Sequence, residues 1–141
     1  MESKAKAVWK GGLKDGNGVI SSGSGAIKEL PYTFKTRFEG AQGTNPEELI
    51  AAAHSGCFSM ALSAELGKAN ITPESIETNA TVSLAQKDGG FSVTDSRLET
   101  TVRAPGGDRS AIERAAADAK ENCPISKLLN AKISLHLTVQ N

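Results

Sequence analysis

The chain contains two cysteines, and both stand at positions where a thiol could react. Cys57 lies deep in a helical stretch, TNPEELIAAAHSGCFSMALSAELG, and Cys123 directly precedes a proline in NCPISKLL. A thiol becomes a good nucleophile only where a cation, a helix N-terminus or a similar group favours the thiolate. A permanent disulfide is not expected in a cytosolic chain, so the two cysteines indicate catalysis or redox sensing rather than a structural cross-link.

Both cysteines also have a plain structural interpretation. Cys57 stands among alanine, glycine and methionine and could be a small core residue. Cys123 favours its thiolate if it caps a helix, and is otherwise an exposed loop thiol. A metal site is a third use, but there is no CxxC motif, and His54 and His136 would have to complete the ligands. His54 is interpreted more simply as a histidine on a helix face, and His136 falls on the outward face of a strand.

Length and charge limit the functions that the chain could have. Its 141 residues suffice for one domain with its own core, so a single domain over residues 1–141 is expected. Lys plus Arg and Asp plus Glu number 16 each, so a nucleic acid is not expected as a partner. The segment MESKAKAVWKGG lacks the apolar core of a secretory signal, and no run approaches the roughly 20 apolar residues of a membrane span. We therefore expect a cytoplasmic protein without membrane contact.

The first 38 residues carry the signals of strands and turns. Alternation and turn residues predict four strands, over 5–10, 18–22, 25–30 and 32–38. The last of these would place four side chains on one face, those of Tyr32, Phe34, Thr36 and Phe38. Arg37 would then point away from the aromatic side, and its plain interpretation is an arginine exposed to solvent.

A long helix follows, and its first turn is marked by its residues. Asn45 is the expected N-cap, Pro46 the first helical residue and Glu48 the partner in a capping box, with the end near Gly67. Helical spacing predicts one apolar stripe of Leu49, Ala53, Cys57, Met60, Ala61 and Ala64, and a second flank of Ile50, Phe58 and Leu62. A helix this apolar must be covered on most sides, by a sheet and a second helix.

The C-terminal half predicts a sheet and two further helices. Strands are expected over 76–84, 91–104 and 132–140, with a bulge near Asp95 where the apolar face changes. A helix is expected to begin with a capping box of Ser110 and Glu113 and to bury Ile112, Ala115, Ala116 and Ala119. Because a proline disfavours helical geometry in the residue before it, Cys123 is expected to cap a short helix over 124–130. In the last strand the expected inward residues are Ile133, Leu135, Leu137 and Val139.

The run YTFKTRFEGAQGTNPEELIAAAHSGCFSMALS, with NCPISKLL further on, resembles the OsmC/Ohr family. The family comprises osmotically inducible protein C and the organic hydroperoxide resistance proteins, and this chain is most similar to the OsmC branch over essentially its whole length. The resemblance implies an α+β, OsmC-like fold in which antiparallel sheets wrap around a long central helix. It also implies an intertwined homodimer with two active sites at the subunit interface.

The resemblance implies a role for four residues. Cys57 matches the cysteine that reduces the peroxide, and Cys123 matches the cysteine that resolves it. Arg37 matches the arginine that activates the thiolate, and Glu47 matches the acid that holds the arginine. Glu47 precedes Cys57 by ten residues, which at 1.5 Å per residue is about 15 Å along a helix. We therefore expect a site that combines the cysteines of one chain with Arg37 and Glu47 of the other, unless the arginine bridges that distance.

The expected reaction is reduction of an organic hydroperoxide, and more weakly of hydrogen peroxide, through a Cys57 sulfenic acid and a Cys57–Cys123 disulfide. The resemblance implies a lipoyl-type dithiol as the reductant, and no haem, flavin or metal is required. Apolar residues such as Phe34, Phe38, Met60 and Ile125 would favour fatty or aryl hydroperoxides if they line the entrance. Two alternatives stay open: a thiol–disulfide redox sensor that uses the same cysteines, and a small apolar-ligand binding protein in which the cysteines only pack.

Overall fold

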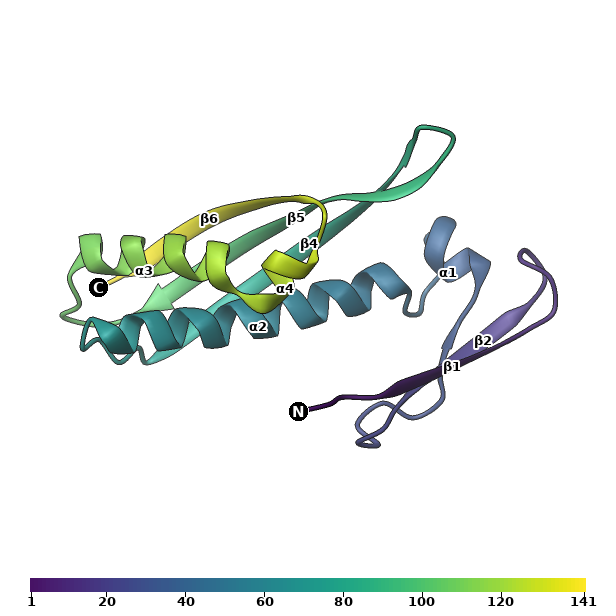
Figure 1. Ribbon diagram of the computed structural model, residues 1–141, viewed down its shortest axis with the longest axis horizontal. Coiled ribbons are helices and arrows are strands. Elements are labelled where there is room, and N and C mark those ends of the chain that lie inside the picture. The colour runs from purple at the N-terminus through teal and green to yellow at the C-terminus, as the bar shows by residue number, and fades with distance from the viewer. The chain divides into compact units, whose positions relative to one another are not determined.

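The computed structural model describes residues 1–141 and contains two compact units, Met1–Leu49 and Ile50–Asn141. The first unit holds β1 (Ala5–Lys10), β2 (Asn17–Ser22), β3 (Leu30–Tyr32), α1 (Phe34–Phe38) and the start of α2 (Pro46–Lys68). The second unit holds the rest of α2 and the remaining elements: β4 (Ser75–Lys87), β5 (Gly90–Arg103), α3 (Arg109–Asn122), α4 (Pro124–Leu128) and β6 (Lys132–Gln140) (Figure 1). Each unit is described by itself below.

The N-terminal unit contains a small antiparallel sheet in the order β1-β2-β3. The rings of Trp9 and Tyr32 lie 5.4 Å apart, centroid to centroid, on either side of Gly18. A Cβ atom at Gly18 would lie 2.6 Å from both rings, so only glycine fits between them. All six residues of β1 are exposed, so this sheet has no apolar core of its own.

The strand expected over 32–38 is wrong, because residues Phe34–Phe38 form the helix α1. Thr33 caps this helix: its hydroxyl accepts a bond from the N–H of Thr36, and the Thr36 hydroxyl accepts one from the N–H of Thr33. The rings of Phe34 and Phe38 lie 4.9 Å apart, and the Arg37 guanidinium lies 5.2 Å from the Phe38 ring centroid. Arg37 is therefore beside the aromatic residues and not on the face opposite them. The segment 25–30 is also irregular rather than a strand, and only Leu30 joins one.

The start of α2 is as expected, with one difference. The Asn45 side chain accepts a 2.9 Å hydrogen bond from the N–H of Glu48, which confirms the N-cap, and Pro46 is the first helical residue. The Glu48 carboxylate accepts a 2.8 Å bond from the hydroxyl of Thr44. The acid that was expected to close a capping box is thus engaged by a preceding hydroxyl.

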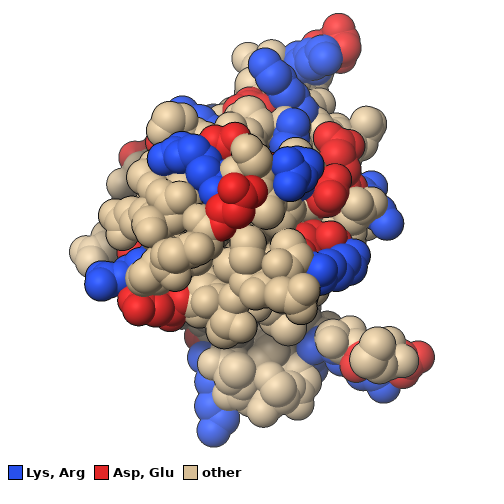
Figure 2. Space-filling model, turned by 90° about the vertical axis from the view of Figure 1, so that its left-hand side faces the viewer, with Lys and Arg blue, Asp and Glu red and all other residues tan.

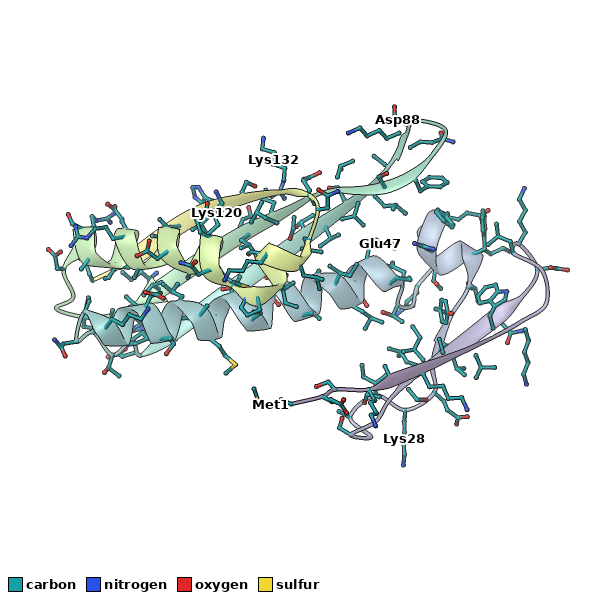
Figure 3. All side chains as sticks on the ribbon, viewed as in Figure 1. Met1, Lys28, Glu47, Asp88, Lys120 and Lys132 are labelled. Carbon is teal, nitrogen blue, oxygen red and sulfur yellow. The ribbon has the colours of Figure 1, made fainter.

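The sheet of the second unit has the order β4-β5-β6. In the β4–β5 ladder Ser83 pairs with Asp95 and Leu84 with Val93, so Thr94 is the extra residue of the expected bulge. Strand β6 runs parallel to β5, which makes this sheet mixed where an antiparallel sheet was expected. Figure 3 shows Asp88 at the turn of the β4–β5 hairpin.

Helices α2 and α3 share one core with this sheet (Figure 1). The core joins Phe58, Leu62 and Leu66 of α2 to Leu98 and Val102 of β5, to the expected α3 stripe and to Val139 of β6. The expected start of α3 is wrong: Asp108 is its N-cap and accepts a 2.8 Å bond from the N–H of Ala111.

The buried face of α2 also differs from the expected stripe. His54, Phe58, Leu62 and Leu66 are fully buried and follow a spacing of four residues. Ala53, Met60 and Ala64 of the expected stripe are exposed, Met60 to 78%. Cys57 and Ala61 of the same stripe are half-buried against the core, so only part of the expected stripe packs, and the buried face is centred on the flank of Phe58 and Leu62.

Helix α2 has the length and composition of a membrane span, since it has 23 residues and its most apolar window has a mean hydropathy of 1.3. The expectation that no run approaches such a span is wrong by this measure. The core helix of a water-soluble protein meets the same criterion, so the observation is weak evidence for a membrane. On the face in Figure 2, positive and negative side chains are interspersed among uncharged ones.

Candidate functional site

The structure brings together the two cysteines. Cys57 lies on α2, and Cys123 lies at the junction of α3 and α4 with φ −54° and ψ 125°. The following Pro124 prevents Cys123 from continuing α3, so the chain turns there and the thiol faces α2. The two sulfurs lie 2.9 Å apart, and both cysteines are free thiols. Cys123 is also the expected N-cap residue of α4.

The two thiols differ in their hydrogen bonds. Burial raises the pKa of Cys57, and the hydrogen bond that it shares with Cys123 raises it further. Burial acts in the same direction on Cys123, but bonds from Cys57, from the N–H groups of Ser126 and Ile125 and from the Ser126 hydroxyl together lower the pKa of Cys123. The N–H of Ile125 also bonds Cys57 and acts to lower its pKa, but it does not offset burial and the bond to Cys123. Because the pKa of Cys57 is raised and that of Cys123 is lowered, we assign the proton between the sulfurs to Cys57.

His54 is a site residue that the sequence analysis missed. It is fully buried, with Nδ1 2.7 Å from the hydroxyl of Ser96 on β5 and Nε2 2.8 Å from the hydroxyl of Ser126 on α4. Burial lowers the pKa of His54, so the imidazole is neutral near pH 7. Its position three residues before Cys57 was the only local signal, since both partners lie far away in the sequence.

Arg37 and Glu47 form an ion pair within the N-terminal unit. Arg37 donates from Nε to Glu47 Oε2 at 3.2 Å and from Nη2 to Oε1 at 2.7 Å, a two-pronged arrangement. Glu47 is 8% exposed, and Figure 3 shows it in the first turn of α2. The expected pairing of these two residues is confirmed. Asn45 stabilises the same corner by donating to the Thr36 carbonyl at 3.2 Å.

An apolar cleft of about 250 Å³ lies in the N-terminal unit beside this ion pair. It is lined by Trp9, Leu13, Tyr32, Thr33, Phe34, Arg37 and Phe38. A cleft with aromatic walls and one fixed cation suits a small molecule with an apolar body and a polar end. Phe34 and Phe38 line this cleft, whereas Met60 and Ile125 do not.

The structure has no group of three or more His, Cys, Asp or Glu side chains that could hold a metal ion. His54 is bonded to two hydroxyls, and His136 lies on an exposed position of β6.

Comparison with known proteins identifies the family. The sequence profile of the family described as OsmC-like protein matches residues 39–138. The chain belongs to the OsmC family. It is 50% identical over 135 residues to the peroxiredoxin OsmC of Escherichia coli K12, which covers 96% of this chain and 94% of that protein. It is 30% identical to an organic hydroperoxide resistance protein of Xanthomonas axonopodis pv. citri, over 86% of this chain and 84% of the relative.

A solved structure agrees with this OsmC-family assignment. The organic hydroperoxide resistance protein OhrB of Bacillus subtilis superposes with a TM-score of 0.75 at 31% identity, over 96% of this chain and 98% of that one. The expected α+β, OsmC-like fold is thereby confirmed. The roles of Cys57, Cys123, Arg37 and Glu47 in the OsmC-family chain stay predictions, as do its single domain and its homodimer.

Proposed function

We propose that this chain is a cysteine-based peroxidase that reduces organic hydroperoxides to alcohols. The observation that carries the proposal is the pair of free thiols 2.9 Å apart, because a sulfenic acid on one would be within reach of the other. Membership of a family with a named peroxiredoxin and named organic hydroperoxide resistance proteins supports the same chemistry.

In the first step the Cys57 thiolate attacks the distal oxygen of the hydroperoxide. The O–O bond breaks, the sulfur is oxidised to a sulfenic acid that keeps the hydroperoxide proton, and the alkoxide takes a proton to leave as an alcohol. Because burial and Cys123 disfavour the Cys57 thiolate, a positive charge is required to form it. Arg37, oriented by Glu47, has the charge and the donors to stabilise both the thiolate and the oxygens.

In the second step the Cys123 thiolate attacks the sulfur of the sulfenic acid. A disulfide forms, and hydroxide leaves and is protonated to water. A dithiol of the lipoyl type then reduces the disulfide by exchange and leaves as its own cyclic disulfide. The lowered pKa of Cys123 suits this role, since a larger thiolate fraction makes the attack faster at neutral pH.

The substrate class follows from the cleft beside Arg37. Four aromatic side chains line it, those of Trp9, Tyr32, Phe34 and Phe38, and they can bury an alkyl or aryl group while Arg37 binds the peroxide end. Hydrogen peroxide has no apolar part to fill such a cleft, so we expect a weaker reaction with it.

We further propose that the working form is a homodimer. The N-terminal unit has no buried apolar side chain, and Ala53, Met60 and Ala64 lie on an exposed apolar side of α2. Apolar surfaces of this kind are typical of an interface between copies. A heterodimer of Cys57→Ser and Arg37→Ala subunits tests the composition of its sites. Half of the wild-type activity would place Arg37 beside the partner's cysteines, and no activity would place it beside those of its own chain.

The decisive experiment measures consumption of cumene hydroperoxide by the purified protein with dihydrolipoamide as reductant. We expect turnover by the wild type, none by Cys57→Ser, and a single turnover followed by over-oxidation in Cys123→Ser. Arg37→Ala should lose most of the rate of the first step. Stoichiometric oxidation of the wild type without turnover would instead favour the redox sensor, and binding of the peroxide without oxidation would favour a passive binding protein.

A further inference from the structure

A chain of hydrogen bonds runs from the sheet to Cys123 through a buried histidine. It begins at the Ser96 hydroxyl on β5, passes through both nitrogens of His54 on α2, and continues to the Ser126 hydroxyl on α4. Ser126 is the third residue of α4, the helix that Cys123 caps, and its N–H and hydroxyl act as donors that lower the pKa of the Cys123 thiol. Ser96 and His54 are fully buried, so these bonds do not compete with bulk water.

The chemistry of the members fixes the direction of the chain when Cys123 is a thiolate. A thiolate only accepts, so the Ser126 hydroxyl donates to it, and the Ser126 oxygen is left to accept from His54 Nε2–H. The neutral imidazole then has an unprotonated Nδ1, which accepts from the Ser96 hydroxyl. When Cys123 is a thiol, the same four groups can reverse every bond. His54 is thus a two-state element whose tautomer follows the charge on the sulfur.

We propose that His54 is a positioning residue for the second half-reaction: through Ser126 it holds the hydroxyl that stabilises the attacking sulfur of Cys123. The inference rests on the proposed function, because it assigns Cys123 the resolving role. The titratable side chain that touches Cys123 directly is Cys57, and His54 acts one hydroxyl further away. The groups that bond His54 from β5 and α4 are the uncharged hydroxyls of Ser96 and Ser126.

Two substitutions separate the two nitrogens of His54. His54→Gln places an amide nitrogen near the position of Nε2 and can still donate to Ser126, whereas His54→Asn reaches only the position of Nδ1 and keeps the bond to Ser96. Ser126→Ala removes the intermediate hydroxyl from a half-buried position in a helix, where alanine is well tolerated. His136→Asn, at an exposed position of β6, is the control histidine.

The experiment titrates the Cys123 thiolate by its ultraviolet absorbance in a Cys57→Ser background, where Cys123 is the only thiol. We expect His54→Asn and Ser126→Ala each to raise the pKa of Cys123 by about one unit, the equivalent of one hydrogen bond. The double variant should raise it no further, and His54→Gln should stay near the parent. In the background with both cysteines, stopped-flow disulfide formation after one equivalent of peroxide should slow by up to about tenfold, with the first step unchanged.

Three results would contradict the proposed role of His54. An unchanged pKa of Cys123 in folded Ser126→Ala and His54→Asn would overturn it, as would equal effects of His54→Asn and His54→Gln. Additive effects of the two sites would also overturn it, because residues in one chain of bonds must not add. The thiolate titration needs no peroxide, so a raised pKa of Cys123 in a protein without turnover would reject the peroxidase but keep the action of His54 and Ser126 on the Cys123 thiolate.

Discussion

The two units of this chain are ordered by different interactions. The unit Ile50–Asn141 contains every buried apolar side chain, and its helices share one core with its sheet. In the unit Met1–Leu49 the buried residues are Gly18, Thr44 and Glu47, and order comes from the Thr33 cap, from ring contacts and from the Arg37–Glu47 ion pair.

This difference divides the proposed chemistry into two parts. The thiols are positioned by a packed core, where a displaced helix would cost several core contacts. Arg37 and the aromatic cleft are positioned by polar bonds of the N-terminal unit, each of modest strength. Substitutions in the core should therefore change stability most, and substitutions around Arg37 should change activity more than stability.

The largest expected effect is on the core. Phe58→Ala removes a fully buried ring at the centre of the core and should lower the free energy of unfolding by about 3–5 kcal/mol. Val8→Ala, in exposed strand β1, should cost less than about 1 kcal/mol. Urea unfolding followed by circular dichroism measures both. Equal losses of unfolding free energy in the two variants would contradict the difference between the two units. They would mean that β1 is buried in the dimer as deeply as Phe58 is in the chain.

The second effect concerns the ion pair of the N-terminal unit. Glu47→Gln removes the buried anion that orients the partly exposed Arg37 guanidinium, so we expect a loss of about 1 kcal/mol together with most of the peroxidase rate. The exposed pair of Glu74 and Arg103, 2.8 Å apart, is the control. Glu74→Gln should cost less than about 1 kcal/mol and leave the rate unchanged. A Glu47→Gln enzyme with full activity would remove Arg37 from the proposed mechanism.

Much of the fold follows from the sequence, and the errors have physical causes. Asn45 and Pro46 are local signals for the start of α2, and the change of apolar face near Asp95 is a local signal for the bulge. Phe34 and Phe38, however, are four residues apart, a spacing that puts side chains on one side of either a strand or a helix. The capping box formed by Thr33 and Thr36 stabilises the helix, and the alternation of apolar residues alone does not indicate this capping box.

The site was less predictable than the fold. The resemblance supplied the four residues of the expected site, and the structure confirms only their pairing, Cys57 with Cys123 and Arg37 with Glu47. His54 was assigned to a helix face because a histidine between alanine and serine carries no signal of its own. Its partners stand 42 and 72 residues further along the chain, so only the folded sheet and α4 reveal them.

A third prediction concerns the pH dependence of stability in the core unit. The pKa of His54 is lowered by burial from 6.5, so below pH 6.5 the unfolded chain binds a proton that the folded chain does not. The stabilisation is complete above pH 6.5 and is lost as the pH falls toward the lowered pKa, at up to about 1.4 kcal/mol per pH unit. His54→Gln should lose less stability than the wild type over this range. His136→Asn should follow the wild type, and identical slopes for all three would contradict the burial of His54.

The smallest expected effect on stability comes from removing one helix cap in each unit. Thr33→Ala removes the cap of α1 in the N-terminal unit, and Asp108→Ala removes the cap of α3 in the other. Both should cost about 1 kcal/mol, because each leaves one helix N–H without its acceptor. Their effects on catalysis should differ. Thr33→Ala loosens the helix that carries Arg37 and lines the cleft, so it should raise the KM for cumene hydroperoxide and lower kcat, whereas Asp108→Ala should leave both unchanged. If the two variants lose activity equally, the position of Arg37 and the positions of the two thiols depend on one another. The two units would then not position these groups independently.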